Sequence, residues 1–130
     1  SVKFHILGIA RPAHEVPPNV AYYGELPFPQ TIPYIKFANC GLYTLEPSSR
    51  PMQAYTDSLK VMQYRYCGLP IVAPNFLDLH RKGVFYYTPG DASSCQGAVQ
   101  QALQNGPDAS YAQEVHTWDE VAKTLLDNPK

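Results

Sequence analysis

Short apolar segments alternate along the chain with segments of helical periodicity. The apolar segments show little strict alternation, which is typical of strands that are buried on both faces of a sheet. Gly, Pro and Asn residues cluster between them, as expected at turns. The predicted strands are VKFHILG (2–8), VAYYG (20–24), CGLYTLE (40–46), PIVAP (70–74) and VFYYT (84–88).

Four segments have the spacing of amphipathic helices. The first lies within 27–39 and is helical from about Gln30, provided that Pro33 falls in its first turn. The second follows a capping residue among Thr56, Asp57 and Ser58 and stops near Gly68. The third is capped near Asp91 and ends at about residue 105. A last helix over 110–127 carries an apolar stripe of Val115, Trp118, Val121, Ala122 and Leu125.

This order of elements predicts an α/β fold, a Rossmann-like parallel sheet flanked by helices. The length of 130 residues favours a single domain. In parallel sheets, ligands bind at the carboxyl ends of the strands, in the loops that follow. Candidate ligand-binding positions therefore lie after Gly8, at Gly24-Glu25, from Glu46 onward, after Pro74 and at Thr88.

The helix over 58–67 has two faces of different character. Leu59, Met62 and Tyr66 share the face that we expect to pack on the sheet. Lys60 and Gln63 stand one turn apart on the other face, which would look toward the loops. A lysine near a helix N-terminus suits a phosphate, and a glutamine amide can hydrogen-bond sugar hydroxyls. The alternative is a solvated helix face without function.

Other polar residues give weaker indications. Glu25 follows the strand-ending Gly24 and is either a ligand contact or an exposed turn carboxylate. Asp91 is explained as a helix cap, and His5 as a core or edge histidine rather than a catalyst. The chain has neither a Walker phosphate-binding loop nor a nucleophile elbow.

Composition excludes several classes of function. Ten basic and eleven acidic residues leave no basic excess, so nucleic acid is not an expected partner. No apolar run is long enough to cross a membrane. The four histidines lack metal-ligand spacing, so no metal is expected. No CxxC motif occurs, and the apolar surroundings of Cys40, Cys67 and Cys95 predict reduced, buried thiols in a cytosolic protein.

Several motifs in order resemble a known family. They are FHILG, NVAYYGELPFPQTIPYIKFANCGLYTL, DSLKVMQYRYCGLPIVAPN and FYYTPGDASS, over roughly residues 3–105. Together they resemble the C-terminal, donor-nucleotide-binding domain of GT-B glycosyltransferases, and more narrowly the glucuronosyltransferases of bacterial xanthan biosynthesis. The segment at 57–75 is the most specific of these motifs.

The resemblance implies roles for five residues. Lys60 falls on the family's lysine near the donor phosphates, and Gln63 on the position that binds ribose. Glu25 falls on a Gly-Glu turn that helps to hold the uracil end. Leu26 and Leu59 occupy positions where the xanthan-type enzymes have methionines, a departure that is compatible with fitting the nucleotide. We therefore expect Glu25, Leu26, Leu59, Lys60 and Gln63 to bind the donor substrate.

The resemblance also implies an activity. The family's enzymes invert configuration as they move glucuronate from UDP-glucuronate to a lipid-linked oligosaccharide in exopolysaccharide synthesis. They need no metal or other cofactor, and they lie in the cytoplasm or on the cytoplasmic face of the inner membrane. Their catalytic base belongs to an N-terminal domain, so no catalytic residue is expected in this chain.

Two further expectations follow from how the motifs align. The family's domain begins with a central strand that has no counterpart before FHILG. A partial domain of this kind would be inactive alone, and its open sheet edge would favour self-association. Two alternatives remain: a transferase that uses another UDP-hexose, and a non-catalytic α/β binding or interaction module.

Overall fold

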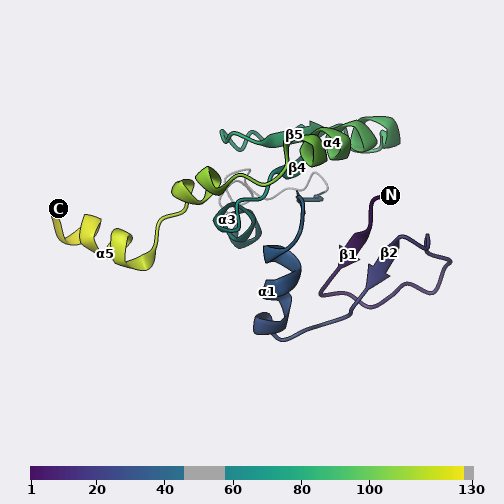
Figure 1. Ribbon diagram of the computed structural model, residues 1–130, viewed down its shortest axis with the longest axis horizontal. Helices are drawn as coiled ribbons and strands as arrows, with labels where there is room; N and C mark the ends of the chain where they lie inside the picture. Colours follow the sequence, from purple (N-terminus) through teal and green to yellow (C-terminus); the bar gives the residue numbers. More distant parts are fainter. Residues whose placement is uncertain (46–57, 128–130) are drawn as a thin grey trace. The chain divides into compact units, whose positions relative to one another are not determined.

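The computed structural model describes residues 1–45 and 58–127 and shows an α/β protein with parallel strands (Figure 1). The chain divides into two compact units, Ser1–Phe37 and Ala38–Lys130. Each unit has its own sheet. The predicted α/β class with parallel strands and flanking helices is confirmed.

The first unit contains two parallel strands and a helix. β1 (Phe4–Ile6) and β2 (Val20–Tyr22) pair in register, with Phe4 opposite Val20. α1 (Phe28–Lys36) begins about one half-turn earlier than expected, because Pro27 takes the N-cap position and Pro29 fits the first turn. Pro33 lies inside the helix rather than in its first turn, which corrects the sequence-based expectation.

The second unit is built on a three-stranded parallel sheet in the order β3-β4-β5. β4 (Ile71–Pro74) is central and all four of its residues are buried, as its apolar sequence predicts. β5 (Val84–Tyr87) matches its predicted position. β3 (Gly41–Leu42) is much shorter than the predicted 40–46, and Glu46 lies outside the described residues.

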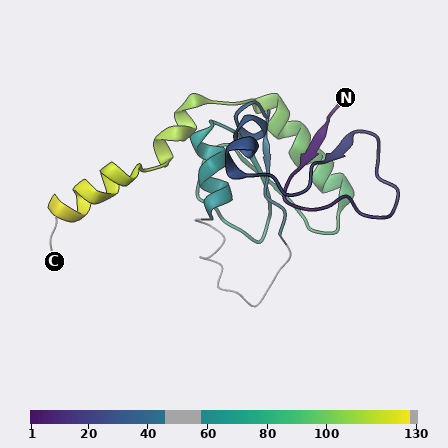
Figure 2. The same cartoon turned by 90° about the horizontal axis from the view of Figure 1, so that it is seen from below.

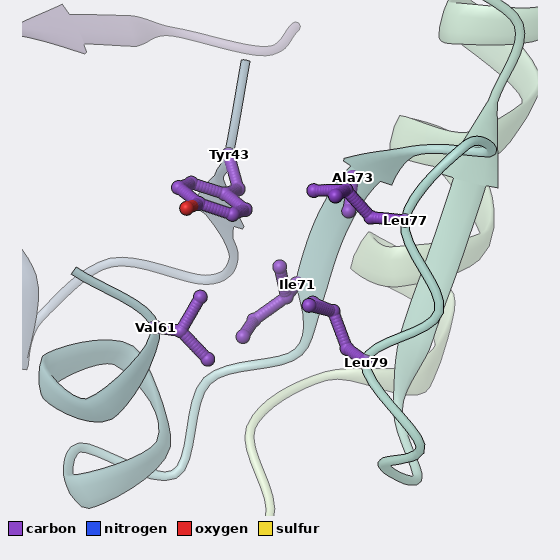
Figure 3. Close-up of a cluster of buried hydrophobic side chains, with 6 residues drawn as sticks. All are labelled: Tyr43, Val61, Ile71, Ala73, Leu77 and Leu79. Atoms are coloured by element: carbon purple, nitrogen blue, oxygen red, sulfur yellow. The ribbon is translucent and has the colours of Figure 1, made fainter. Parts of the chain in front are cut away.

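Helices cover both faces of this sheet. Because side chains alternate along a strand, Ile71 and Ala73 of β4 join one apolar cluster and Val72 joins another. The first cluster also contains Val61 of α3 (Leu59–Tyr66) (Figure 3). The second contains Ala98, Val99 and Ala102 of α4 (Ala92–Asn105).

The connection between β4 and β5 is unusually short for parallel strands, which are commonly joined through a helix. Residues 75–83 return the chain to the start of β5 without one. Leu77 and Leu79 enter the cluster around Ile71 and are 2% and 4% exposed (Figure 3). These two side chains supply the apolar surface that a crossover helix would otherwise provide.

The C-terminal segment differs from the single helix predicted over 110–127. It forms a 3₁₀ helix, η1 (Ala109–Glu114), and then α5 (Trp118–Asp127), two helical segments joined by an extended stretch (Figure 2). The break arises because Thr117 and Glu120 form a capping box: the Thr117 hydroxyl accepts from the Glu120 N–H, and the Glu120 carboxylate accepts from the Thr117 N–H. The predicted apolar stripe is not buried, and Trp118 is 87% exposed.

The three cysteines also depart from expectation. Cys40, Cys67 and Cys95 are free, as predicted, but each is half-buried rather than fully buried. Burial raises the pKa of the Cys40 thiol above its ordinary value.

Candidate donor-binding site

Helix α3 carries the polar pair that the sequence singles out. Ser58 caps the helix, since its hydroxyl accepts a hydrogen bond from the Val61 N–H at 3.3 Å. The other two predicted caps, Thr56 and Asp57, lie outside the described residues. Lys60 is exposed in the first turn, and Gln63 is half-buried one turn later. The cap thus fixes where the helix begins and places Lys60 beside its free N–H groups.

The other end of α3 is closed by a Schellman motif. Gly68 has a φ of +72°, its N–H donates to the Arg65 carbonyl at 2.9 Å, and the Leu69 N–H donates to the Tyr64 carbonyl at 2.9 Å. The predicted stop at Gly68 is confirmed. The chain passes directly from this turn into β4, so α3 has little freedom to slide along the sheet.

The N-terminal turn of α3 lies beside the carboxyl end of β3. Tyr43 follows β3 and continues its pairing, since its N–H donates to the Val72 carbonyl at 2.8 Å. The Lys60 ammonium lies 6.0 Å from the centre of the Tyr43 ring. Lys60 is therefore at the edge of the sheet where parallel folds bind ligands, as the sequence predicts.

The buried face of α3 is not the predicted one. Leu59 and Tyr66 are 72% and 67% exposed, whereas Val61 and Arg65 are fully buried. Arg65 can be buried on this face of α3 because it forms an ion pair with Glu114, which lies far away in the sequence. Leu59 is consequently an exposed apolar residue next to Lys60.

Arg65 is held by residues from distant parts of the chain. Its Nε and Nη2 donate to the two carboxylate oxygens of Glu114 at 2.9 and 2.7 Å, and its guanidinium carbon lies 3.8 Å from the centre of the Tyr111 ring. Arg81 donates to the same carboxylate at 3.2 Å. Sequence reasoning missed this cluster because 49 positions separate Arg65 from Glu114.

The charges in this cluster shift the acidity of Glu114. Partial burial raises its pKa, but hydrogen bonds and positive charge from Arg65 and Arg81 outweigh that effect. The net pKa of Glu114 lies below the ordinary value of a glutamate. The carboxylate stays ionised at neutral pH and ties η1 to α3 and to the connection before β5.

The ends of β4 and β5 carry a second group of polar side chains on the same edge of the sheet. The Asn75 amide, after β4, donates to the Thr88 hydroxyl, after β5, at 3.0 Å. The Thr88 N–H donates to the Ser94 hydroxyl at 2.9 Å, and the Ser94 N–H donates to the Asp91 carboxylate at 3.0 Å. Asp91 is the helix cap that the sequence predicts. These contacts fix the start of α4 at this edge.

Glu25 and Leu26 belong to the first unit. Glu25 is exposed and Leu26 half-buried, and both follow Gly24, whose φ is +67°. His5 is exposed on β1, and its Nδ1 lies 2.8 Å from the Tyr23 hydroxyl.

The five predicted donor-binding residues are thus divided between the two units. Leu59, Lys60 and Gln63 lie on α3 in the second unit. Glu25 and Leu26 are neighbours in the first. Their roles in ligand binding remain predictions.

Two further features bear on chemistry. In residues 1–45 and 58–127, no three His, Cys, Asp or Glu side chains lie close enough together to hold a metal ion. Within the same ranges, no helix combines the length and the apolar character needed to span a bilayer.

Comparison with known proteins identifies a relative. The chain is 37% identical over 127 residues to a protein of Xanthomonas campestris pv. campestris named UDP-glucuronate:glycolipid 2-beta-glucuronosyltransferase. The match covers 97% of this chain but 31% of the relative, so the chain spans about a third of that protein's length. No protein family model matches the chain. The similarity to a glucuronosyltransferase that the motifs indicate is confirmed: the chain resembles about a third of a bacterial glycolipid glucuronosyltransferase.

Proposed function

We propose that this chain is the donor-binding part of an inverting glycosyltransferase of the GT-B type. It would bind UDP-glucuronate, whose glucuronate passes to a lipid-linked oligosaccharide in exopolysaccharide synthesis. The observation that carries the proposal is the position of Lys60, in the first turn of α3 and next to Tyr43 at the carboxyl end of β3. The similarity to a glucuronosyltransferase over nearly the whole chain supports it.

The chemistry of α3 suits a nucleoside diphosphate. Its N-terminus carries a partial positive charge, and its first turn contains no acidic residue to oppose an anion. Lys60 adds a full positive charge that would offset part of the negative charge of the diphosphate. The Gln63 amide, one turn further on, can reach the ribose hydroxyls if the diphosphate lies at Lys60.

The remaining predicted contacts would complete the nucleotide site. Glu25 would hold the uracil end, while the apolar side chains of Leu26 and Leu59 would shape the pocket. The relative's name supports UDP-glucuronate as the donor and a glycolipid as the acceptor class. We propose that the full protein works in the cytoplasm or on the cytoplasmic face of the bacterial inner membrane, where such donors are available.

The proposal is tested by titrating UDP and UDP-glucuronate into the chain and following thermal unfolding. A ligand that binds only the native state stabilises it by about 2.7 kcal/mol at a hundredfold excess over Kd. We expect a dose-dependent rise in Tm for the unsubstituted chain. Lys60→Ala should abolish most of that rise, and Gln63→Ala should reduce it.

Matched controls separate site effects from general effects of charge or of helix composition. Lys123→Ala removes an exposed lysine of α5, and Gln96→Ala removes an exposed glutamine of α4. Both variants should show the same rise in Tm with UDP as the unsubstituted chain. Greater stabilisation by UDP-glucose than by UDP-glucuronate at equal concentration would favour a different UDP-hexose as donor. If no uridine nucleotide raises Tm at millimolar concentration, the donor-site proposal fails and a non-catalytic binding module is favoured.

A further inference from the structure

Tyr43 stands out among the residues at the proposed donor edge because sequence reasoning assigned it no role. It follows β3 directly, and its side chain is 3% exposed. Its backbone N–H is fixed by the Val72 carbonyl at 2.8 Å, so the residue is anchored to the central strand. Both its backbone and its ring are therefore held in place by the sheet.

The ring of Tyr43 packs where α3 begins. Tyr43 and Val61 belong to one apolar cluster with Ile71 and Ala73 (Figure 3). Val61 is fully buried and directly follows Lys60 in the first turn of the helix. The Tyr43 ring thus contacts the turn that carries Lys60, and the Lys60 ammonium lies 6.0 Å from its centre.

The nearby Tyr43 ring restricts the side chain of Lys60. An exposed lysine samples many rotamers and loses much of that freedom when it binds an anion. An aromatic face within about 6 Å attracts an ammonium group and limits the rotamers that it visits. A lysine held in this way before the ligand arrives binds an anion more tightly than an unrestrained one.

We propose that Tyr43 is a positioning residue, whose ring holds the Lys60 ammonium at the carboxyl edge of β3 for the diphosphate of a bound nucleotide. The inference rests on the proposed function, since it concerns the same site. The contact with the Lys60 ammonium is made by the ring of Tyr43. Tyr43 acts only through Lys60 and touches no reacting atom.

The test is a double-mutant cycle on UDP affinity, measured by calorimetry at low salt. Tyr43→Leu removes the ring and keeps an apolar side chain in the cluster, and Lys60→Gln removes the charge and keeps a long side chain. We expect Tyr43→Leu to weaken UDP binding by about two- to fivefold, the range expected of an exposed cation–π contact. In the Lys60→Gln background the same substitution should have no further effect. Tyr43→Phe should bind UDP as the unsubstituted chain does.

A spectroscopic measurement tests the contact directly, first in the unsubstituted chain and then in the two Tyr43 variants. Protons above an aromatic face resonate upfield, so the side-chain methylene protons of Lys60 should be shifted upfield in the unsubstituted chain. The shift should persist in Tyr43→Phe and disappear in Tyr43→Leu. Lys60 methylene protons at ordinary chemical shifts would overturn the inference.

Failure of this inference is distinguishable from failure of the proposed function. If the unsubstituted chain binds UDP but Tyr43→Leu weakens binding equally in both backgrounds, Tyr43 has only a structural role. A Tyr43→Phe variant as weak as Tyr43→Leu would assign the effect to the hydroxyl and overturn the inference as well. If the unsubstituted chain binds no UDP, the proposed function itself fails.

Discussion

Glu114 is the residue on which the placement of α3 depends most. Its two oxygens bind Arg65, which is fully buried, and one of them also binds Arg81. Glu114→Ala would leave the Arg65 guanidinium buried without its carboxylate, which costs about 3–5 kcal/mol in the free energy of unfolding. Urea denaturation measures this loss. Glu15→Ala, at an exposed position of the first unit, should change stability by no more than about 0.5 kcal/mol.

Because of the same ion pairs, the contribution of Glu114 to the free energy of unfolding depends on pH. The pKa of Glu114 in the folded chain lies below its value in the unfolded chain, so its stabilisation is fully present above the unfolded pKa of about 4.5. The stabilisation is lost as pH falls through the folded pKa. The stability difference between the unsubstituted chain and Glu114→Gln should therefore narrow only in acid. A difference that is constant from pH 7 to pH 3 would contradict the role of these ion pairs.

Residue-level prediction succeeded where local spacing decides the outcome. Lys60 and Gln63 fall one turn apart on any helix that starts at Ser58, and the parallel-sheet order places that helix start at the ligand-bearing edge. The buried face of α3 was predicted wrongly because apolarity alone favoured Leu59 and Tyr66. The true face depends on Arg65, whose partner Glu114 lies far away in sequence and becomes visible only once the chain is folded.

At the scale of an element, the end of α3 depends on one glycine. Gly68 has a φ of +72°, and a Cβ at this position would lie 2.9 Å from the Asp108 carbonyl oxygen. Gly68→Ala should therefore destabilise the fold by about 1–3 kcal/mol, since an L residue is strained in this conformation. Thermal or urea unfolding measures the effect. The substitution should also weaken UDP binding by disturbing the passage from α3 into β4.

Gly97 provides the matched control for that substitution. It lies inside α4 with ordinary helical backbone, and a Cβ there would meet no atom within 4 Å. Gly97→Ala should stabilise the chain by up to about 1 kcal/mol, because alanine favours a helix over glycine. If both variants shifted stability in the same direction, the conformational role of Gly68 would be refuted.

Elements were predictable where their boundaries have local causes. Ser58, Gly68 and Asp91 act within a few residues, and all three predicted boundaries are confirmed. The break before α5 also has a local cause, the Thr117-Glu120 capping box, but the apolar stripe across it favoured one continuous helix. The length of β3 was not predictable, because an apolar residue just beyond the end of a strand can also be buried in the core, as the side chain of Tyr43 is.

At the scale of the whole molecule, the similarity to the Xanthomonas enzyme leads to a prediction about glucuronate transfer. The matched region is 31% of that enzyme, and the proposed role of this chain is to hold the donor. If the chain is the donor-binding part of a GT-B transferase, as proposed, the base that activates the acceptor belongs to another domain, and the chain alone should bind UDP-glucuronate without transferring glucuronate. With a glycolipid acceptor present, UDP release measured by a coupled assay should stay at background. The full Xanthomonas enzyme in the same assay is the positive control. Release by this chain at a comparable rate would mean that it contains its own base, and the proposed division between donor binding and catalysis would be wrong.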